Sequence, residues 1–392
     1  MKIDVFAENG TDLTELGNKF DAWLATHDRP ADFVAIHKSV GCRPAKLTPR
    51  LEGVTAVHGA TSCLGVMSDA GPRIQNGAGA FAIWDDAGDY GTAMRPFEHD
   101  PRASARNAVE AALLAADRPS EAPDLIWLSS SPGHEEAVLA GIEDVVGGNV
   151  PIMGGSAADD TVAGEWLVYD SEGSASAGVV ISVLFPSTKV SFAYHNGYAP
   201  TPRSGIVTAA DGRLLKAIDD RPAADVYREW VGEGVIPDQV NGTTAILSES
   251  TLSPLGQYLD SVGDVPYYLL SHPASLTPEG HLELFADVEA GDQLTLMNGS
   301  PDQLTRRAGK VAALAAQSGS FQPDELAGAL MVYCGGCMLA VRDRLDDVTS
   351  GVTEALPDVP FLGIFTFGEQ GVVLDGRNRH GNLMISAILF GA

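Results

Sequence analysis

The chain has 392 residues, of which 45% are hydrophobic and 20% charged, and its net charge is −27. This length predicts two domains rather than one core, and the composition excludes wholesale disorder. The negative charge disfavours nucleic acids and anionic membrane surfaces as partners. No apolar run reaches the roughly 20 residues that cross a bilayer, and the N-terminus has no signal-peptide core, so we expect a cytoplasmic location.

One pattern occurs three times along the chain: an apolar strand, a loop of small residues, a helix, a second strand, and a loop rich in small and polar residues. The first copy runs from Phe33 to Cys63, and its helix is interrupted by Pro44 and Pro49. The second copy runs from Leu125 to Asp160, and the third from Met331 to Glu369. Such units favour parallel strands, so we expect their polar loops to share one rim of the fold.

These units predict an α/β protein of two related domains, each a mixed sheet covered by helices, with a ligand cleft at the strand-end loops. We place the domains at residues 1–205 and 206–392. Further helices are expected at Ala103–Ala116 and from Ser300, which can cap a helix that has Pro301 in its first turn.

A series of short motifs supports a more specific identification. In chain order they are Gly154-Gly155-Ser156, His195-Asn196-Gly197-Tyr198, Gly291-Asp292, Tyr333-Cys334-Gly335-Gly336, Pro360-Phe361-Leu362-Gly363, Phe367-Gly368-Glu369 and His380-Gly381-Asn382. In this order they resemble the FIST family, whose members pair an N-terminal and a C-terminal FIST domain. The resemblance spans about residues 30 to 390, and Cys337 departs from it because many relatives have arginine there.

The resemblance implies an intracellular small-ligand sensor that signals to a partner protein, rather than a turnover enzyme. One subgroup of stand-alone bacterial FIST proteins binds haem, senses nitric oxide, and acts on a histidine kinase or a cyclic-di-GMP enzyme. Haem is therefore the cofactor that the resemblance implies, and a homodimer is a further expectation.

The candidate ligand-binding residues all lie where predicted strands end. They are His58, Gly59, Thr61, Ser129, Ser130, Gly154, Gly155, Ser156, Cys334, Gly335, Gly368 and Glu369. The serine and glycine runs offer hydroxyls and backbone N–H groups to an anion, and the Glu369 carboxylate suits a cationic ligand group.

Four histidines at strand ends are candidates for an axial haem ligand: His37, His58, His134 and His195. His58 is the preferred one, because Gly59 lets a planar ligand approach the backbone.

Two alternatives stay open. Cys334 and Cys337 form a CxxC motif before a helix, where the pKa of a thiol can fall, so the protein could be a thiol redox sensor. The same cysteines could instead be small residues chosen for packing. The other alternative is an uncharacterised small-molecule enzyme that uses Glu369 and the serine loops, although no familiar nucleophile–base spacing is present.

Overall fold

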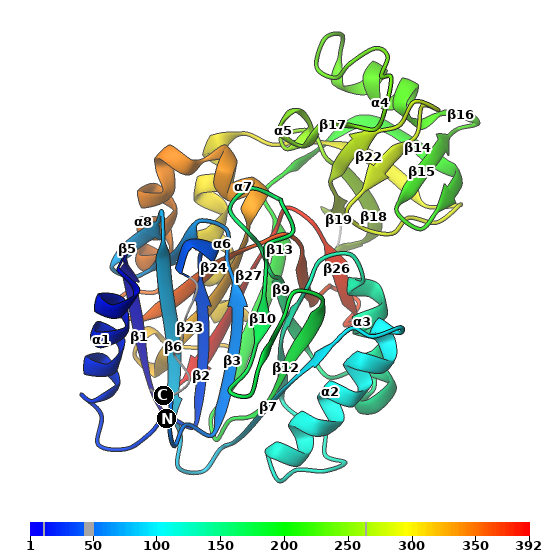
Figure 1. The fold of residues 1–392 in the computed structure, drawn as a ribbon. Coiled ribbons are helices and arrows are strands. Elements are labelled where there is room, and N and C mark those ends of the chain that lie inside the picture. The colour runs from blue at the N-terminus through cyan, green and yellow to red at the C-terminus, as the bar shows by residue number, and fades with distance from the viewer. Residues whose placement is uncertain (11, 43–50, 263–264) are drawn as a thin grey trace.

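The computed structural model describes residues 1–10, 12–42, 51–262 and 265–392. It is an α/β fold with a large body of three mixed sheets and a smaller lobe, residues 199–298, that projects from one end of the body (Figure 1). The first predicted helix, with Pro44 and Pro49, lies outside the described residues. Within the described residues, no helix is long and apolar enough to span a membrane.

The first sheet of the body contains the first repeated unit. Its strand order is β1 (Lys2–Asn9), β6 (Gly77–Trp84), β2 (Phe33–Lys38), β3 (Ala56–Thr61), β10 (Val168–Tyr169) and β11 (Ser174–Ala175). Strands β2 and β3 are parallel, with Phe33 opposite Ala56 and Lys38 opposite Thr61. The helix α1 (Leu13–Leu24) precedes β2, and a single 3₁₀ turn, Val40–Cys42, follows it.

The second sheet contains the second unit. Its order is β26 (Asn378–Gly381), β25 (Glu369–Val372), β9 (Ile152–Ser156), β8 (Leu125–Ser130), β12 (Gly178–Phe185) and β7 (Asp89–Pro96). Helices α2 (Pro101–Ala115) and α3 (Glu135–Val146) cover its outer face (Figure 1). In α3, Val138 and Ile142 lie on the face that packs against the sheet and are fully buried.

The third sheet contains the third unit. Its order is β13 (Val190–Asn196), β27 (Met384–Gly391), β23 (Leu326–Cys334), β24 (Phe361–Thr366), β4 (Gly65–Ser68) and β5 (Gly71–Ile74). The helices of this part are α6 (Pro301–Ser318), α7 (Gly335–Ala340) and α8 (Leu345–Ala355). Ser300 caps α6 as predicted, since its Oγ accepts from Gln303 N at 3.3 Å.

The lobe has its own small core and its own strands. They are β14 (Ala199–Asp211), β15 (Leu214–Ile218), β16 (Arg221–Pro222), β17 (Thr244–Ala245), β18 (Leu255–Val262), β19 (Val265–Ser271), β20 (Pro273–Leu276), β21 (Leu282–Leu284) and β22 (Gln293–Asn298), with helices α4 (Ala223–Val231) and α5 (Leu247–Ser250). Leu215, Tyr227, Leu255 and Leu294 pack together inside it.

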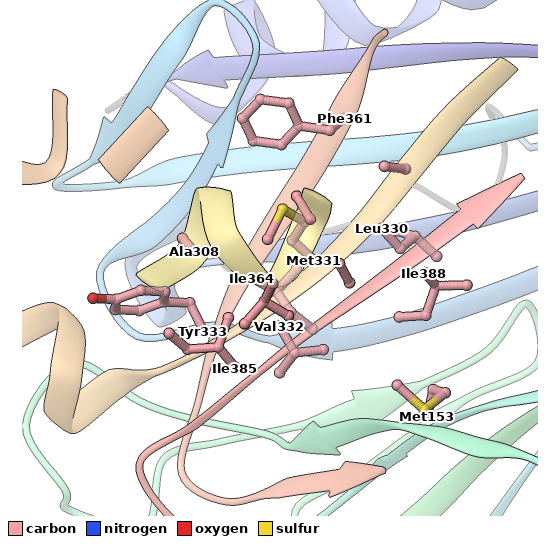
Figure 2. Close-up of a cluster of buried hydrophobic side chains, with 14 of the residues drawn as sticks. Met153, Ala308, Leu330, Met331, Val332, Tyr333, Phe361, Ile364, Ile385 and Ile388 are labelled. Carbon is pink, nitrogen blue, oxygen red and sulfur yellow. The ribbon is translucent and has the colours of Figure 1, made fainter. Parts of the chain in front are cut away.

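The three body sheets turn one face each toward a shared apolar interior. Figure 2 shows part of it: Leu330, Val332 and Ile388 from the third sheet, with Met153 approaching from β9 of the second. Burial of this many aliphatic side chains is the main source of stability for the body.

Strands from the two ends of the chain pair with each other in two sheets. Strand β24 pairs with β4, and β25 pairs with β9. The predicted domain boundary between residues 205 and 206 falls inside β14. The body contains residues from both sides of this boundary, and the division into two domains stays a prediction.

Candidate functional site

The loops that follow the second strand of each unit meet in one place. Three backbone hydrogen bonds close a ring between them: Cys63 N to Phe365 O, 3.0 Å; Ala158 N to Thr61 O, 3.0 Å; and Phe367 N to Ser156 O, 3.1 Å. Each bond runs from one unit to the next through the same pair of positions. We call residues 61–63, 156–158 and 365–367 the junction; it confirms the prediction that these loops share one rim.

Several predicted site residues lie at or beside the junction. Ser156 N donates to Gly368 O at 2.7 Å, and the Thr366 side chain lies against Gly155, where an added Cβ would be only 2.5 Å from it. Gly154 lies one residue earlier in β9, and its φ of +152° brings its Cα so close to Leu128 O that no side chain would fit.

Glu369 is fully buried and begins strand β25, whereas we expected it in a loop at the rim. Its carboxyl oxygens accept from Thr366 Oγ1 at 2.7 Å and from Met384 N at 3.0 Å. Burial, reinforced by the neighbouring Cys334, raises the pKa of Glu369 well above its usual value. A buried carboxyl group with both oxygens already hydrogen-bonded within the fold is a poor partner for a cationic ligand, so the geometry favours a structural role.

Ser156 is the junction residue with polar contacts that lead outward. Its Oγ donates to Glu135 Oε1 at 2.6 Å, and Glu135 Oε2 lies 2.6 Å from the guanidinium of Arg213 in the lobe. Burial alone would raise the pKa of Glu135, but His380 and Arg213, with the Ser156 hydrogen bond, lower it to about 2. Glu135 is therefore a charged group that links the junction to the lobe.

A second series of polar contacts connects the Ser156 hydroxyl to the lobe. Gln370 Nε2 donates to Ser156 Oγ at 3.4 Å and lies 3.1 Å from His380 Nδ1. The other ring nitrogen of His380 lies 3.1 Å from Phe285 O in the lobe. These contacts could not be predicted from local sequence patterns, because Glu135, Arg213 and Phe285 belong to elements far apart in the chain.

His58 lies inside β3, not after it, and this corrects our prediction of a strand-end position. It is fully buried, with Nδ1 2.9 Å from Ser182 Oγ and Nε2 3.0 Å from Ser129 Oγ. Ser129 and Ser130 likewise belong to β8 rather than to a loop. The hydroxyls of Ser182 and Ser129 satisfy the His58 ring, and burial, with the neighbouring His37, holds the pKa of His58 well below its usual value.

The haem expectation does not fit His58. Both of its ring nitrogens are engaged by hydroxyl groups, so neither is free to bind iron. His37 has unengaged ring nitrogens among the described residues, but its ring packs edge-on against Trp127, with centroids 6.0 Å apart. Within the described residues no group of three or more His, Cys, Asp and Glu side chains is placed to hold a metal ion.

Both cysteines of the CxxC motif are buried and are not joined by a disulfide. Cys334 and Cys337 are free thiols, and Cys337 Sγ lies 3.6 Å from Tyr198 Oη. Burial, with the neighbouring Cys337, raises the pKa of Cys334, whereas we expected the helix start to lower it. Gly335 packs beside Thr366 O, so this loop supports the junction through close backbone contact.

Lys38 lies beside the junction and was not predicted from the sequence as a functional residue. It ends β2 opposite Thr61, is 1% exposed, and its Nζ has no hydrogen-bond partner in the described part of the chain. The available signal was a lysine directly after an apolar strand, in a chain with only seven lysines. Gly59, a predicted site residue, lies under the Tyr169 ring that Lys38 faces.

The chain is similar to two curated proteins and, more distantly, to solved structures. The chain is 25% identical over 245 residues to uncharacterized proteins of Mycobacterium bovis and of Mycobacterium tuberculosis, a match covering 61% of this chain and 60% of each relative. Among solved structures, a cyanuric acid hydrolase from A. caulinodans has a TM-score of 0.38 at 9% identity, covering 99% of this chain and 98% of that one. PurLQS from Thermotoga maritima has a TM-score of 0.21 at 10% identity, covering 78% and 73%.

Two family models cover most of the chain. The FIST N domain matches residues 33–221, and the FIST C domain matches residues 223–372. FIST domains are small-ligand sensing domains. With both domains present in order, the chain belongs to the FIST family.

Proposed function

We propose that this protein is an intracellular sensor in which a small ligand at the junction controls how the lobe is held against the body. The observation that carries the proposal is the position of Ser156. Its hydroxyl contacts both Glu135 and Gln370, and these lead to Arg213 and Phe285 of the lobe. A ligand that takes over the Ser156 hydroxyl therefore changes two connections between junction and lobe at once.

The signal follows from differential affinity. A ligand that binds better to one lobe position than to the other shifts the population toward that position by the difference in binding free energy. Glu135 makes the response sensitive to the ligand, because a buried carboxylate that loses a hydrogen bond is costly.

The readout is a partner protein that recognises one lobe position. A histidine kinase or a cyclic-di-GMP enzyme is the partner to test first, and a homodimer is the form in which to test it. If haem is the ligand, its iron must be bound by a residue other than His58.

The experiment combines a ligand screen with hydrogen exchange. A panel of metabolites, with haem included, is screened by thermal unfolding; a ligand at 100 times its Kd stabilises by about 2.7 kcal/mol. For each hit, exchange is then measured in residues 199–298 with and without ligand. We expect a change in lobe protection, and expect Ser156→Ala to abolish that change.

Ser350→Ala is the matched control, because Ser350 is an exposed serine of α8. A hit that binds tightly, yet leaves lobe exchange identical in the wild type, would show that the lobe does not carry the signal. If the protein is folded and no metabolite of any class stabilises it, the sensor proposal is wrong.

A further inference from the structure

Within the described residues, Lys38 is a buried cation without a carboxylate partner. Two other lysines have carboxylate partners near the surface: Lys19 Nζ lies 3.4 Å from Glu8, and Lys216 Nζ lies 3.2 Å from Asp211. Lys38 instead faces an aromatic ring and the neighbouring Cys42. In a chain with 52 acidic residues, a buried lysine left unpaired calls for an explanation beyond stability.

The ring beneath this amine is held in place from two sides. Lys38 Nζ lies 4.6 Å from the centroid of the Tyr169 ring. The ring lies directly over Gly59, where an added Cβ would be 1.9 Å from a ring carbon, and the Tyr169 hydroxyl donates to Ile36 O at 3.0 Å. The aromatic face is therefore fixed below the amine before any ligand arrives.

Burial lowers the pKa of Lys38 to about 7, and Cys42 opposes the shift only in part. At neutral pH, Lys38 is then an uncharged amine in a large fraction of the molecules, whereas an ordinary lysine is protonated in almost all of them. A desolvated lysine of this kind is a nucleophile toward carbonyl carbon.

We propose that Lys38 is an attachment point for a small carbonyl compound, an aldehyde or a 2-oxo acid, which it holds as an imine. The amine lone pair forms the new C–N bond, and the carbonyl oxygen leaves as water with the two hydrogens of the amine. Protonation of the imine nitrogen gives a cation, which the Tyr169 face stabilises. This site is separate from the junction ligand, and either can fail without the other.

The test is reductive trapping on the full-length protein. The chain is incubated with glyoxylate or with acetaldehyde at pH 7.5, sodium cyanoborohydride is added, and the modified lysines are located by peptide mass spectrometry. We expect Lys38 to be modified at least about tenfold faster than the exposed Lys189 and Lys310, because more of it is unprotonated. Trapping by glyoxylate alone would assign the site to 2-oxo acids, and trapping by both would assign it to aldehydes generally.

Lys38→Arg should remove the fast adduct and leave the slow ones. Modification of Lys38 that is absent, or no faster than that of the exposed lysines, would overturn the proposal.

Two ring variants test the role of Tyr169. Tyr169→Phe keeps the aromatic face and loses only the bond to Ile36, so trapping should continue at a similar rate. Tyr169→Leu should slow it severalfold, with near-UV circular dichroism confirming the fold. Equal trapping in both variants would show that the aromatic face plays no part.

Discussion

Glu135 and Lys38 are two buried charged residues, each 1% exposed, in two different units of the body. Glu135 is surrounded by partners: Ser156, Gly133 N and Arg213 all contact its carboxylate. Lys38 has a ring below it and no hydrogen bond within the described residues. The same degree of burial therefore gives opposite outcomes, a carboxylate that stays charged and an amine that loses its proton readily.

The difference teaches that burial alone does not decide what a charged side chain does. Where the fold supplies partners, the charge is a structural link, as between α3 and the lobe. Where it supplies none, the group is available for chemistry. The following predictions test this contrast from the largest expected effect to the smallest.

Arg213→Met removes the guanidinium that contacts Glu135 and leaves a buried carboxylate. We expect a loss of about 4 kcal/mol at pH 7, measured by urea unfolding. In the wild type, the charged Glu135 contributes to the free energy of unfolding above its unfolded pKa of about 4.5, and this contribution is lost as pH falls toward 2. The difference in stability between wild type and variant should therefore shrink in acid. Arg344→Met, which breaks exposed ion pairs with Asp302 and Asp347, should cost less than about 1 kcal/mol.

Lys38→Met should stabilise the protein, because it removes a buried group that must lose its proton on folding. Lys38 has a folded pKa of about 7 and an unfolded pKa near 10.4, so wild-type stability should rise with pH between these values. The free energy of unfolding of Lys38→Met should exceed that of the wild type by about 3 kcal/mol at pH 8, and this difference should decrease toward pH 10. Lys310→Met, at an exposed position, should show no such pH dependence; a flat wild-type profile would contradict the assignment.

Ser129→Ala takes away the hydroxyl beside His58 Nε2. The ring nitrogen is then buried without this partner, and we expect a loss of about 1.5 kcal/mol. Equilibrium unfolding measures it, with Ser350→Ala as the comparison. A neutral result would mean that water replaces the hydroxyl.

The cysteines should give the smallest effect. Burial raises the pKa of Cys42, Cys63 and Cys334, so little of each is thiolate, and iodoacetamide should modify these three cysteines in the native chain at under about a hundredth of the rate in the urea-unfolded chain. Rapid native labelling of Cys334 and Cys337, followed by disulfide formation under mild oxidation, would restore the redox-sensor alternative.

The sequence predicted the three strand pairs and the meeting of their loops, because apolar runs and small-residue loops report local structure directly. It misplaced His58, Ser129 and Ser130, because polar residues at the end of an apolar run look like a loop. In the fold they remain in the strands, since hydroxyls of the neighbouring sheet satisfy the histidine. This is a tertiary effect that no local pattern contains.

The third unit was predicted to contain one helix, and this was only partly right. Val341, Leu345, Val348 and Val352 are all buried, but Val341 is the C-cap of α7 and the other three lie in a separate helix, α8. Lys38 went unnoticed for a similar reason, because its ring partner Tyr169 comes 131 residues later and is positioned by Gly59 and Ile36.

The pairing of β24 with β4 and of β25 with β9 has a consequence for how the chain is made. When the ribosome has released only the first 221 residues, β4 and β9 still lack these neighbours, and such unpaired edges promote aggregation. The N-terminal part can complete its sheets only after the last strands have been synthesised, so we expect the body to fold slowly and late. We also expect poor solubility when residues 33–221 and 223–372 are expressed as separate polypeptides.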